Sequence, residues 1–513
     1  MNNNIVDFFY TYCDKYHDNT FIKNFDGRLY TYGEMNKIVS KTYHFLKDYN
    51  LKTDDKVSII LPNVPEYISL LLGVLSHGGV AVNLNINFTP DEFKLRLLDA
   101  EVSMVITTPE LFDKIKDVLA DCSIQKILIV TNDTLSDNQV YNVELINKGN
   151  ISTERFLPNF DGNKTAFLQY TGGTTGGIKA AIIMHKNVVS NVFQIRNHFG
   201  DNLIEGAEIM PTTFPLYHVF ALTFNIFTFL SAGATCLMFP VTKDLPQLIK
   251  ILKENKITCF VGVNTLYRLL IQSGQLTKKD FPNLKVCIGG GEHIQFSTKI
   301  NWQDLSGVPI HEAYGMTETS AMAIVNPIDD RNDLETIGIP IPDTQALLLD
   351  ENDNEITEDN IHGEIVLKGP QVIQEYWKKP DENKSSFING WLRTGDIAIW
   401  KNGSYLRIVD RKKDMISVSG FKVFPNEIEA VVALFDGIID CAVIGEKDEQ
   451  TGERVVLYYV SEKELNEQEL SAYCRKYLTA FKVPKKIVKV SLIPKTAIGK
   501  TMRSSLRKMQ VSG

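Results

Sequence analysis

The sequence predicts an α/β protein with a large N-terminal domain and a small C-terminal α/β domain. Through about residue 330, short apolar runs alternate with helical patterns, which is typical of mostly parallel β-sheets covered by helices, and we expect two such sheet subdomains. From about 335 to 410, short strands separated by turn residues predict a small β-barrel-like subdomain. A charged run at 410–414 then precedes about 100 residues of mixed helix and strand, the size of one domain. We therefore expect two domains, 1–410 and 411–513.

Hydrophobic patterning predicts the individual elements. Short apolar runs predict buried strands at Val57–Leu61, Met104–Thr107, Lys126–Val130, Ala234–Phe239, Thr258–Val261 and Leu284–Ile288. Between these runs, the pattern predicts helices over Glu66–Ser76, Pro90–Asp99 and Asp244–Glu254. In the C-terminal domain it predicts a helix over Pro425–Leu434 and strands over Asp440–Gly445 and Val455–Val460.

Composition limits the classes of function. The 513 residues include 54 Lys and Arg against 62 Asp and Glu, a net charge of −8, so the chain as a whole has no electrostatic reason to bind nucleic acid. The seven cysteines lie at least 23 residues apart, which excludes Cys-x-x-Cys metal and redox motifs and favours free thiols in a reducing compartment. The N-terminus lacks the pattern of a secretory signal, so we expect a cytoplasmic protein.

One uncharged segment, Val219–Phe239, is 21 residues long, enough to span a bilayer. Asn225, Ser231 and Gly233 interrupt it, and Pro240 ends it. The first half has a helical pattern, and Ala234–Phe239 has the pattern of a short strand after the glycine. We therefore expect a buried helix followed by a buried strand, and at most peripheral contact with a membrane.

A glycine- and threonine-rich segment, YTGGTTGGIKAAIIMHKN at 170–187, carries the most chemical information. Four glycines and three threonines lie within 171–177, a composition that brings backbone amides and hydroxyls close to a triphosphate. A Walker A loop would need Lys and then Ser or Thr after Gly177, but Ile178 and Lys179 stand there, so a P-loop NTPase is excluded. Composition alone leaves an ordinary turn as the alternative.

Further motifs follow in a fixed order: PLYHVF (215–220), GVNTLY (262–267), GGGE (289–292), EAYGMTE (312–318), WLRTGD (391–396), IVDRKKDMISVSG (408–420) and IPKTAIGK (493–500). This series resembles the adenylate-forming superfamily of acyl-CoA ligases, luciferases and adenylation domains over nearly the whole chain. The chain is most similar to bacterial medium- and long-chain fatty acyl-CoA ligases. The resemblance implies that ATP activates a carboxylic acid as an acyl-AMP and that the acyl group then passes to a thiol.

The resemblance implies a nucleotide site assembled from several of these motifs. The phosphates would be cradled by Thr171, Gly172, Gly173, Thr174, Thr175 and Gly176, with Lys179 nearby. The rest of ATP would be bound by Gly290, Gly291, Glu292, Tyr314, Gly315, Asp396 and Arg411. Within this set, Tyr314 would stack on adenine and Asp396 would accept from both ribose hydroxyls. The residues alone leave an alternative to nucleotide binding for two of these side chains. Lys179 would then be a solvated surface lysine, and Arg411 would form a salt bridge at the domain boundary.

The resemblance also assigns the reacting groups. Lys500 would bridge the attacking carboxylate and the α-phosphate, while Thr317 would contact that phosphate and Glu318 would hold Mg²⁺. The bland alternative for the Thr-Glu pair is a helix N-cap. His218 would lie beside the acyl carboxylate, and a histidine satisfied in the core is its alternative.

The implied acyl pocket is lined by His218, Val219, Phe220, Gly262, Val263 and Gly289. Ser419 and Gly420 would line a channel for the thiol of coenzyme A. Because Lys500 lies far beyond the domain boundary, the C-terminal domain would have to close over the first domain. The resemblance implies that this mobile domain has its hinge at Lys413 and Asp414.

The substrate follows from what the pocket segment lacks. No Asp or Glu occurs from Pro211 to Phe239, so a buried ammonium group would be unpaired and amino acids are disfavoured. An apolar wall with Phe220, Leu222, Phe224 and Phe227 suits a medium- or long-chain fatty acid, with an aryl acid as the alternative. An acyl carrier protein is the alternative acceptor. A catalytically inactive nucleotide- or lipid-binding relative is the alternative outside enzymes, and the sequence leaves open whether the chain forms a homodimer.

Three positions depart from the family pattern. Ile178 stands where the family often has Pro, and Ala180 where it usually has Gly. Glu375 replaces the Gly that usually precedes Tyr-Trp, which puts a carboxylate near the rim of the expected site.

Overall fold

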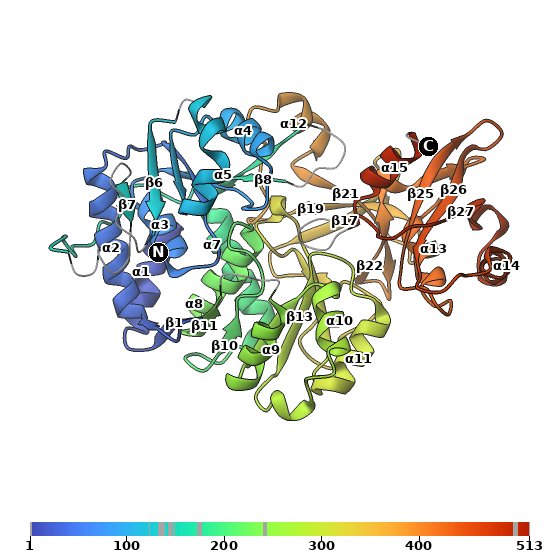
Figure 1. The fold of residues 1–513 in the computed structure, drawn as a ribbon, viewed down its shortest axis with the longest axis horizontal. Coiled ribbons are helices and arrows are strands. Elements are labelled where there is room, and N and C mark those ends of the chain that lie inside the picture. Colours follow the sequence, from blue (N-terminus) through green and yellow to red (C-terminus); the bar gives the residue numbers. More distant parts are fainter. Residues whose placement is uncertain are drawn as a thin grey trace.

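A computed structural model describes residues 3–122, 124–131, 139–141, 146, 149–171, 177–239, 244–495 and 501–511. In the described residues, the first lobe is built on a seven-stranded sheet in the order β7-β6-β5-β3-β4-β8-β9 (Figure 1). Its strands are β3 (Lys56–Ile60), β4 (Val80–Asn83), β5 (Met104–Thr107), β6 (Lys126–Val130), β7 (Gln139–Tyr141), β8 (Thr165–Tyr170) and β9 (Ala180–Met184). All neighbouring strands are parallel except β8 and β9.

Helices cover both faces of this sheet. Alternate strand residues point to opposite sides, so both faces carry apolar side chains that the helices bury. On β5, Val105 faces the core beneath α4 and α5, whereas Met104 and Ile106 face the core beneath the other helices. Thr89 and Glu92 form a capping box that starts α4 at the expected residue. The helices of the lobe are α1 (Ile5–Lys15), α2 (Tyr32–Asp48), α3 (Pro65–Ser76), α4 (Pro90–Asp99), α5 (Pro109–Ala120) and α7 (His185–Phe199).

A second lobe holds two more sheets. One has the order β10-β11-β1-β2, from β1 (Thr20–Asn24), β2 (Leu29–Thr31), β10 (Ile209–Pro211) and β11 (Thr235–Met238). The other has the order β12-β13-β14-β15-β16, from β12 (Cys259–Gly262), β13 (Val286–Gly290), β14 (Ile310–Tyr314), β15 (Ile324–Val325) and β16 (Ile339–Pro340). Helices α9 (Leu245–Glu254), α10 (Asn264–Gln272) and α11 (Phe296–Ser306) pack on it through Leu252, Tyr267 and Trp302.

The expected strand at Leu284–Ile288 lies two residues later, at β13. Its last residues, Gly289 and Gly290, therefore belong to the sheet and pair with Glu312 and Ala313 of β14. Gly290 allows this pairing because a Cβ there would lie 2.8 Å from the Ala313 carbonyl oxygen. Glycines at a strand end read as a turn in the sequence, which explains the shift.

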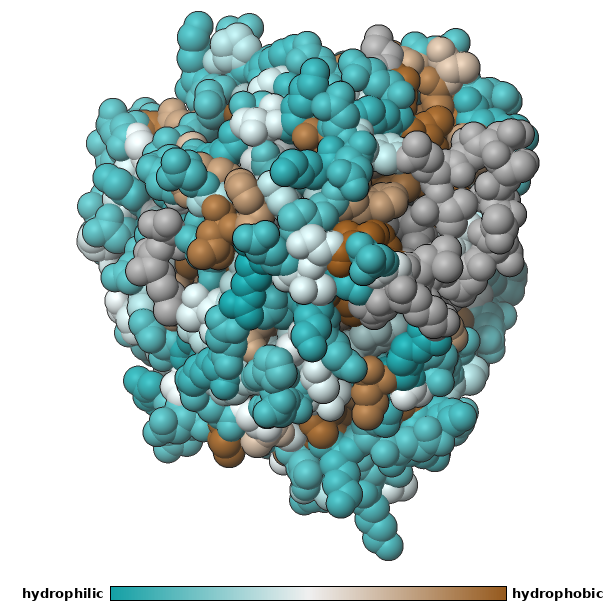
Figure 2. Space-filling model, turned by 90° about the vertical axis from the view of Figure 1, so that its left-hand side faces the viewer, coloured by the Kyte–Doolittle hydropathy of each residue, from teal (hydrophilic) through white to brown (hydrophobic). Residues whose placement is uncertain are grey.

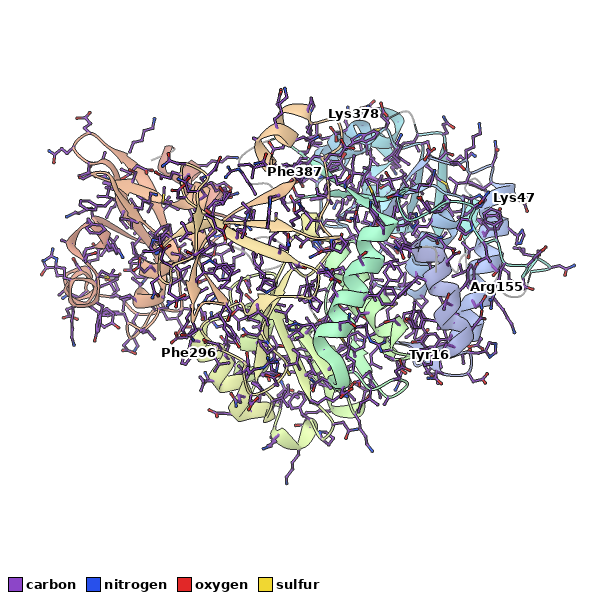
Figure 3. All side chains as sticks on the ribbon, turned by 180° about the vertical axis from the view of Figure 1, so that it is seen from behind. Tyr16, Lys47, Arg155, Phe296, Lys378 and Phe387 are labelled. Carbon is purple, nitrogen blue, oxygen red and sulfur yellow. The ribbon has the colours of Figure 1, made fainter. Side chains whose placement is uncertain are left out.

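The β-rich region forms a six-stranded antiparallel sheet, β18-β17-β19-β21-β20 with β22 beside β21. Its strands are β17 (Gln345–Leu349), β18 (Glu355–Ile356), β19 (Gly363–Lys368), β20 (Phe387–Ile388), β21 (Trp391–Lys401) and β22 (Tyr405–Arg411), with the short helix α12 (Pro380–Ser386) before β20. Figure 3 labels Lys378 and Phe387, which mark the segment that leads from the first lobe into this sheet. Lys378 pairs with Glu101 of the first lobe.

The C-terminal sheet lies at the opposite end of the molecule from the N-terminus (Figure 1). Its order is β24-β23-β26-β25 with β27 beside β26, from β23 (Ile416–Val418), β24 (Phe421–Val423), β25 (Asp440–Asp448), β26 (Gly452–Val460) and β27 (Lys486–Lys489). Helices α13 (Pro425–Val432) and α14 (Glu467–Tyr477) cover one face through Ile428 and Leu470. Helix α15 (Arg503–Val511) covers the other through Leu506.

The apolar segment Val219–Phe239 is folded into the second lobe. It forms a π-helix, η2 (Ala221–Thr228), then a short turn of helix, α8 (Phe229–Ser231), and then β11, which confirms the expected helix and strand. Every residue of η2 is buried. Among the described residues, no helix is both long and apolar enough to cross a membrane. The face seen in Figure 2 is mainly hydrophilic, with hydrophobic residues in small separate patches.

Candidate functional site

Three residues expected at the nucleotide, Tyr314, Asp396 and Arg411, meet at one point. The Tyr314 hydroxyl donates to Asp396 Oδ2 at 2.6 Å, and Arg411 Nε lies 2.7 Å from Asp396 Oδ1. Burial and the neighbouring carboxylate raise the pKa of Tyr314, while Asp396 raises the pKa of Arg411. Both oxygens of a buried carboxylate are therefore held in fixed positions. The boundary salt bridge expected as the alternative for Arg411 exists, but its partner is the candidate ribose ligand.

Strand pairing explains this meeting. Asp396 on β21 and Arg411 on β22 are directly opposite each other. The Thr-Gly-Asp segment, 394–396, lies inside the continuous strand β21. Gly395 has φ +71°, and the register between β19 and β21 shifts here, so the segment forms a β-bulge. A bulge can re-aim a side chain, and here the carboxylate of Asp396 reaches Tyr314 on a different sheet.

A second buried carboxylate, Glu318, lies in the single 3₁₀ turn η4 (Thr317–Thr319) that follows β14. The Tyr376 hydroxyl donates to Glu318 Oε1 at 2.7 Å, and burial together with Glu318 raises the pKa of Tyr376. The backbone at Gly315 lies very close to that of Ala321, so the chain turns back sharply around η4. Only glycine fits there, because a Cβ on residue 315 would lie 1.8 Å from the Ala321 carbonyl oxygen. Thr317 thus belongs to a tight loop. The next element after η4 is the strand β15, so the Thr-Glu pair does not cap a helix of more than one turn.

Lys179 lies on the other side of Tyr376. Its Nζ is 4.3 Å from the centre of the Tyr376 ring and 2.7 Å from Glu382 Oε1. Its side chain is 24% exposed, so it is not a fully solvated surface lysine. Tyr376 therefore contacts Glu318 through its hydroxyl and Lys179 through its ring.

Tyr376 and Glu382 were missed by the sequence interpretation. The sequence marks Glu375 as a departure from the family pattern, but it is the neighbouring Tyr376 that contacts Glu318. Glu375 accepts from Ile182 N at 3.2 Å and Trp377 donates to Ala180 O at 2.9 Å, so this segment pairs with β9. Side chains alternate along a paired segment, and Tyr376 points inward while Glu375 is exposed. That alternation was the signal in the sequence.

The candidate phosphate loop is only partly described. Gly172, Gly173, Thr174, Thr175 and Gly176 lie outside the described residues. Thr171 N donates to Lys179 O at 3.0 Å, which fixes both ends of the loop. The Thr171 hydroxyl is buried and has no hydrogen-bond partner within the described part of the chain. A buried hydroxyl in that state is suited to a ligand oxygen.

The expected acyl-pocket residues come from the ends of two strands and from the segment 218–220 that precedes η2. Gly262 ends β12 and is followed by Val263, and Gly289 lies near the end of β13. A Cβ on Gly291 would lie 3.5 Å from Val263 Cγ1 and 3.7 Å from Phe214. The Phe214 and Phe220 ring centres are 4.9 Å apart. The apolar side chains that begin at Phe220 therefore extend through Phe214 to the glycines at 289–291. Glu292 Oε1 accepts from Thr265 N at 3.0 Å and so holds this segment against the start of α10.

His218 and Val219 follow a loop that two buried amides hold. Asn63 Nδ2 donates to Phe214 O at 3.0 Å and Asn63 Oδ1 accepts from Leu216 N at 2.8 Å. Gln169 Nε2 donates to Tyr217 O at 2.8 Å. His218 is half-buried, with its ring centre 5.0 Å from that of Tyr217. Gln169 is on β8, one residue before the glycine-rich segment 170–187 begins. The end of β8 therefore holds the loop before His218 and also leads directly into that segment.

The C-terminal residues expected for the thiol channel and the hinge lie on either side of β23. Ser419 and Gly420 form the turn between β23 and β24, with φ +51° and +83°, and Ser419 N donates to Thr451 O at 2.7 Å. Lys413 and Asp414 lie in η5 (Lys412–Asp414), where Asp414 Oδ1 accepts from Arg507 at 2.8 Å. Lys500 lies outside the described residues.

Comparison with known families decides the classification. Residues 9–377 match the family of AMP-binding enzymes, and residues 427–500 match the AMP-binding enzyme C-terminal domain. The chain belongs to the AMP-binding enzyme family. Tyr314 and Glu318 lie within the first matched region, and Asp396 and Arg411 lie between the two matched regions.

Relatives within the family extend over most of the chain. A long-chain-fatty-acid–CoA ligase of Salmonella typhimurium is 36% identical over 484 residues, covering 89% of this chain and 86% of the relative. A long-chain-fatty-acid–CoA ligase of Bacillus subtilis is 31% identical over 508 residues, covering 94% and 90%.

A solved neighbour supports the α/β fold. ATP-bound MatB from Rhodopseudomonas palustris is 26% identical and superimposes with a TM-score of 0.89 over 99% of both chains. The apo form of that protein superimposes with a TM-score of 0.80. The arrangement of this chain therefore matches the ATP-bound form more closely than the apo form.

Proposed function

We propose that this protein is an AMP-forming ligase that activates a medium- or long-chain fatty acid with ATP and transfers it to coenzyme A. The observation that carries the proposal is the meeting of Tyr314 and Arg411 on the two oxygens of Asp396. The fatty acid ligases at 31% and 36% identity support this choice of acid and acceptor. The apolar wall around Phe214 and Phe220 supports an acyl chain.

In the first step, a carboxylate oxygen of the fatty acid attacks the α-phosphorus of ATP. The bond from that phosphorus to the bridging oxygen breaks, pyrophosphate leaves, and acyl-AMP forms. Negative charge builds on the phosphoryl group and on pyrophosphate, so positioned positive and hydrogen-bonding groups stabilise the transition state. We assign Asp396 and Arg411 to the ribose, Tyr314 to adenine, and Thr171 with Lys179 to the phosphates. Lys500 supplies the positive charge between acid and phosphate.

The chain's residues suit a magnesium ion that arrives with ATP. Among the described residues, no group of three or more His, Cys, Asp or Glu side chains could hold a metal by themselves. Mg²⁺ takes most of its ligands from phosphates and water and needs one or two protein carboxylates. Glu318, held by Tyr376, is the carboxylate that we assign to it, and the ion would neutralise charge on the pyrophosphate.

In the second step, the sulfur of coenzyme A attacks the acyl carbonyl of acyl-AMP. The thiol loses its proton to solvent water, the bond from the acyl carbon to the AMP oxygen breaks, and AMP leaves. We assign Ser419 and Gly420 to the thiol channel. Residues 411–513 would move as one domain between the two steps, with Lys413 and Asp414 as the hinge.

Mass spectrometry of the products tests the proposal directly. Purified protein is incubated with ATP, magnesium, coenzyme A and a mixed pool of acids, and we expect AMP together with fatty acyl-CoA. Acyl-CoA confined to aryl acids, or transfer only to an acyl carrier protein, would change the assigned substrate or acceptor. No acid-dependent pyrophosphate with any acid would support an inactive nucleotide-binding relative.

Lys500→Ala provides the matching variant. We expect adenylate formation to fall by about 100-fold or more, because one transition-state charge partner is lost. Transfer from preformed acyl-AMP to coenzyme A should persist, since that step has no phosphoryl transfer. Near-normal adenylation by this variant would contradict the assignment of Lys500.

A further inference from the structure

Helix α7 carries three buried amide side chains on one face: Asn187, Asn191 and Gln194, which we call the amide ladder. They are 3%, 0% and 2% exposed. Their spacing of four and three residues places them above one another along the helix. Buried amides require hydrogen-bond partners, so this face must meet polar backbone and not an apolar core. Asn191 and Gln194 lie outside the motifs that carry the proposed chemistry, and Asn187 is the last residue of the segment 170–187.

Asn191 binds the loop that carries Thr317 and Glu318. Its Nδ2 donates to Met322 O at 2.8 Å, and its Oδ1 accepts from Met322 N at 3.1 Å. One side chain thus satisfies both backbone groups of Met322, four residues after Glu318. The loop cannot shift here without breaking two buried hydrogen bonds.

Asn187 and Gln194 bind the segment that leads to Tyr376. Asn187 Nδ2 donates to Pro370 O at 2.7 Å, and Gln194 Nε2 donates to Gln371 Oε1 at 3.0 Å. Two residues further on, Ile373 N donates to Glu318 O at 2.9 Å. The same helix therefore holds both the loop of Glu318 and the segment whose tyrosine binds the Glu318 carboxylate.

A second helix holds the loop independently. The hydroxyl of Thr223, on η2, donates to Ser320 O at 2.7 Å. Ser320 has φ +60°, a conformation that non-glycine residues rarely adopt, and its own hydroxyl donates to Gln371 O at 2.8 Å. The unusual backbone of Ser320 is thus fixed on both sides, directly after η4.

We propose that Asn191 and Thr223 are positioning residues for Glu318 in the adenylation step. They touch neither substrate in the proposed mechanism and act through the backbone of residues 320–322. The inference rests on the proposed function, because it assigns Glu318 a role in the chemistry. Asn191 lies on α7 and Thr223 on η2, and neither helix carries a residue assigned above to the phosphates, the ribose or the thiol.

The test compares Asn191→Leu and Thr223→Val with a matched control, Asn326→Leu. Asn326 is also fully buried and bridges backbone, donating to Thr336 O at 2.8 Å and accepting from Asp333 N at 3.1 Å. Acid-dependent pyrophosphate release gives kcat and the KM values for ATP and fatty acid, and thermal unfolding gives Tm for each variant.

We expect Asn191→Leu to lower kcat by about tenfold or more and Thr223→Val by about threefold or more, because Glu318 loses its fixed position. The KM for fatty acid should stay within about twofold, because the acyl wall is unchanged. Asn326→Leu should lower Tm as Asn191→Leu does but keep kcat within about twofold. A kcat near wild type for both test variants would overturn the proposal, as would an equal loss of kcat in Asn326→Leu. Should Asn191→Leu fail to fold, Thr223→Val alone decides, because it removes a single hydroxyl at nearly constant shape.

A wild-type protein without acid-dependent pyrophosphate release would overturn the proposed function instead. The positioning role is then measured by equilibrium binding of ATP with magnesium to the same variants. A dissociation constant raised about fivefold or more in Asn191→Leu, with Asn326→Leu unchanged, would support the role. Unchanged binding in Asn191→Leu would overturn it.

Discussion

The Tyr314 hydroxyl donates to Asp396 Oδ2 at 2.6 Å across the boundary between two sheets. Tyr314 ends β14 of the second lobe, and Asp396 lies in the bulge of β21. Because a hydrogen bond to a carboxylate contributes more than one between neutral groups, this contact couples the two sheets at the candidate adenosine site.

Tyr314→Phe removes this hydroxyl and keeps the ring. We expect the dissociation constant for ATP to rise by about 3- to 30-fold, since hydrogen bonds to charged groups contribute roughly 1.5–3 kcal/mol, part of which persists through Arg411. Equilibrium ATP binding checks this, and Tyr405→Phe is the control. The Tyr405 hydroxyl is also a hydrogen-bond donor, but its acceptor is the backbone carbonyl of Arg331 in an exposed position. Equal loss of ATP affinity in both variants would contradict a specific role for Tyr314.

Tyr376→Phe isolates the contact with Glu318. The variant keeps the ring beneath Lys179 but leaves Glu318 Oε1 without its donor. We expect kcat for adenylation to fall by about tenfold, because a buried carboxylate without its donor no longer holds one orientation. Stopped-flow measurement of pyrophosphate release checks this. Glu382→Gln, which weakens only the partner of Lys179, should raise the KM for ATP with a smaller change in kcat; the reverse pattern would contradict the assignment.

Gly420→Ala tests the proposed thiol channel separately from adenylation. Gly420 has φ +83°, and an added Cβ would meet nothing within 4 Å, so the cost comes from the backbone and amounts to about 1–2 kcal/mol. We expect transfer from preformed acyl-AMP to coenzyme A to slow while pyrophosphate release is retained. Gly403→Ala is the matched control, since Gly403 has φ +68° and equally open surroundings away from the site. Slower adenylation in Gly420→Ala alone would place this turn at the first step instead.

The sequence was sufficient for the order of elements and for naming the three residues that meet at Asp396. Helix α4 and strands β5 and β6 begin and end at the expected residues, because a capping box and uninterrupted apolar runs mark them locally. Tyr314, Asp396 and Arg411 could be named because each lies in a recognisable motif. The amide ladder could not, because Asn and Gln at helical spacing usually lie on a solvated face and only tertiary packing shows what they meet. The bulge at Gly395 was hidden for a similar reason, since glycine before Asp is also typical of a turn.

The pH dependence of stability provides a test close to the proposed hinge. Burial raises the pKa of Asp410 from 3.8 to about 6, although Arg503 and two backbone amides oppose the shift. Its carboxylate accepts from Asn426 N at 2.8 Å and from Arg411 N at 2.7 Å, and Glu429, a like charge, also faces it. Between about pH 4 and 6, the folded protein therefore keeps a proton that the unfolded chain has released. The free energy of unfolding then falls as pH rises through this window, by at most about 3 kcal/mol from this group.

Asp410→Asn removes this titration. The substitution itself changes Tm by a fixed amount through the altered hydrogen bonds to Asn426 and Arg411. On top of that amount, the difference in Tm should move in favour of the asparagine variant as pH rises from about 4 to 6, and then stay constant above about pH 7. Differential scanning calorimetry at several pH values measures both curves. Parallel curves across the whole range would show that Asp410 titrates alike in the folded and unfolded chain, and the buried environment assigned to its carboxylate would be wrong.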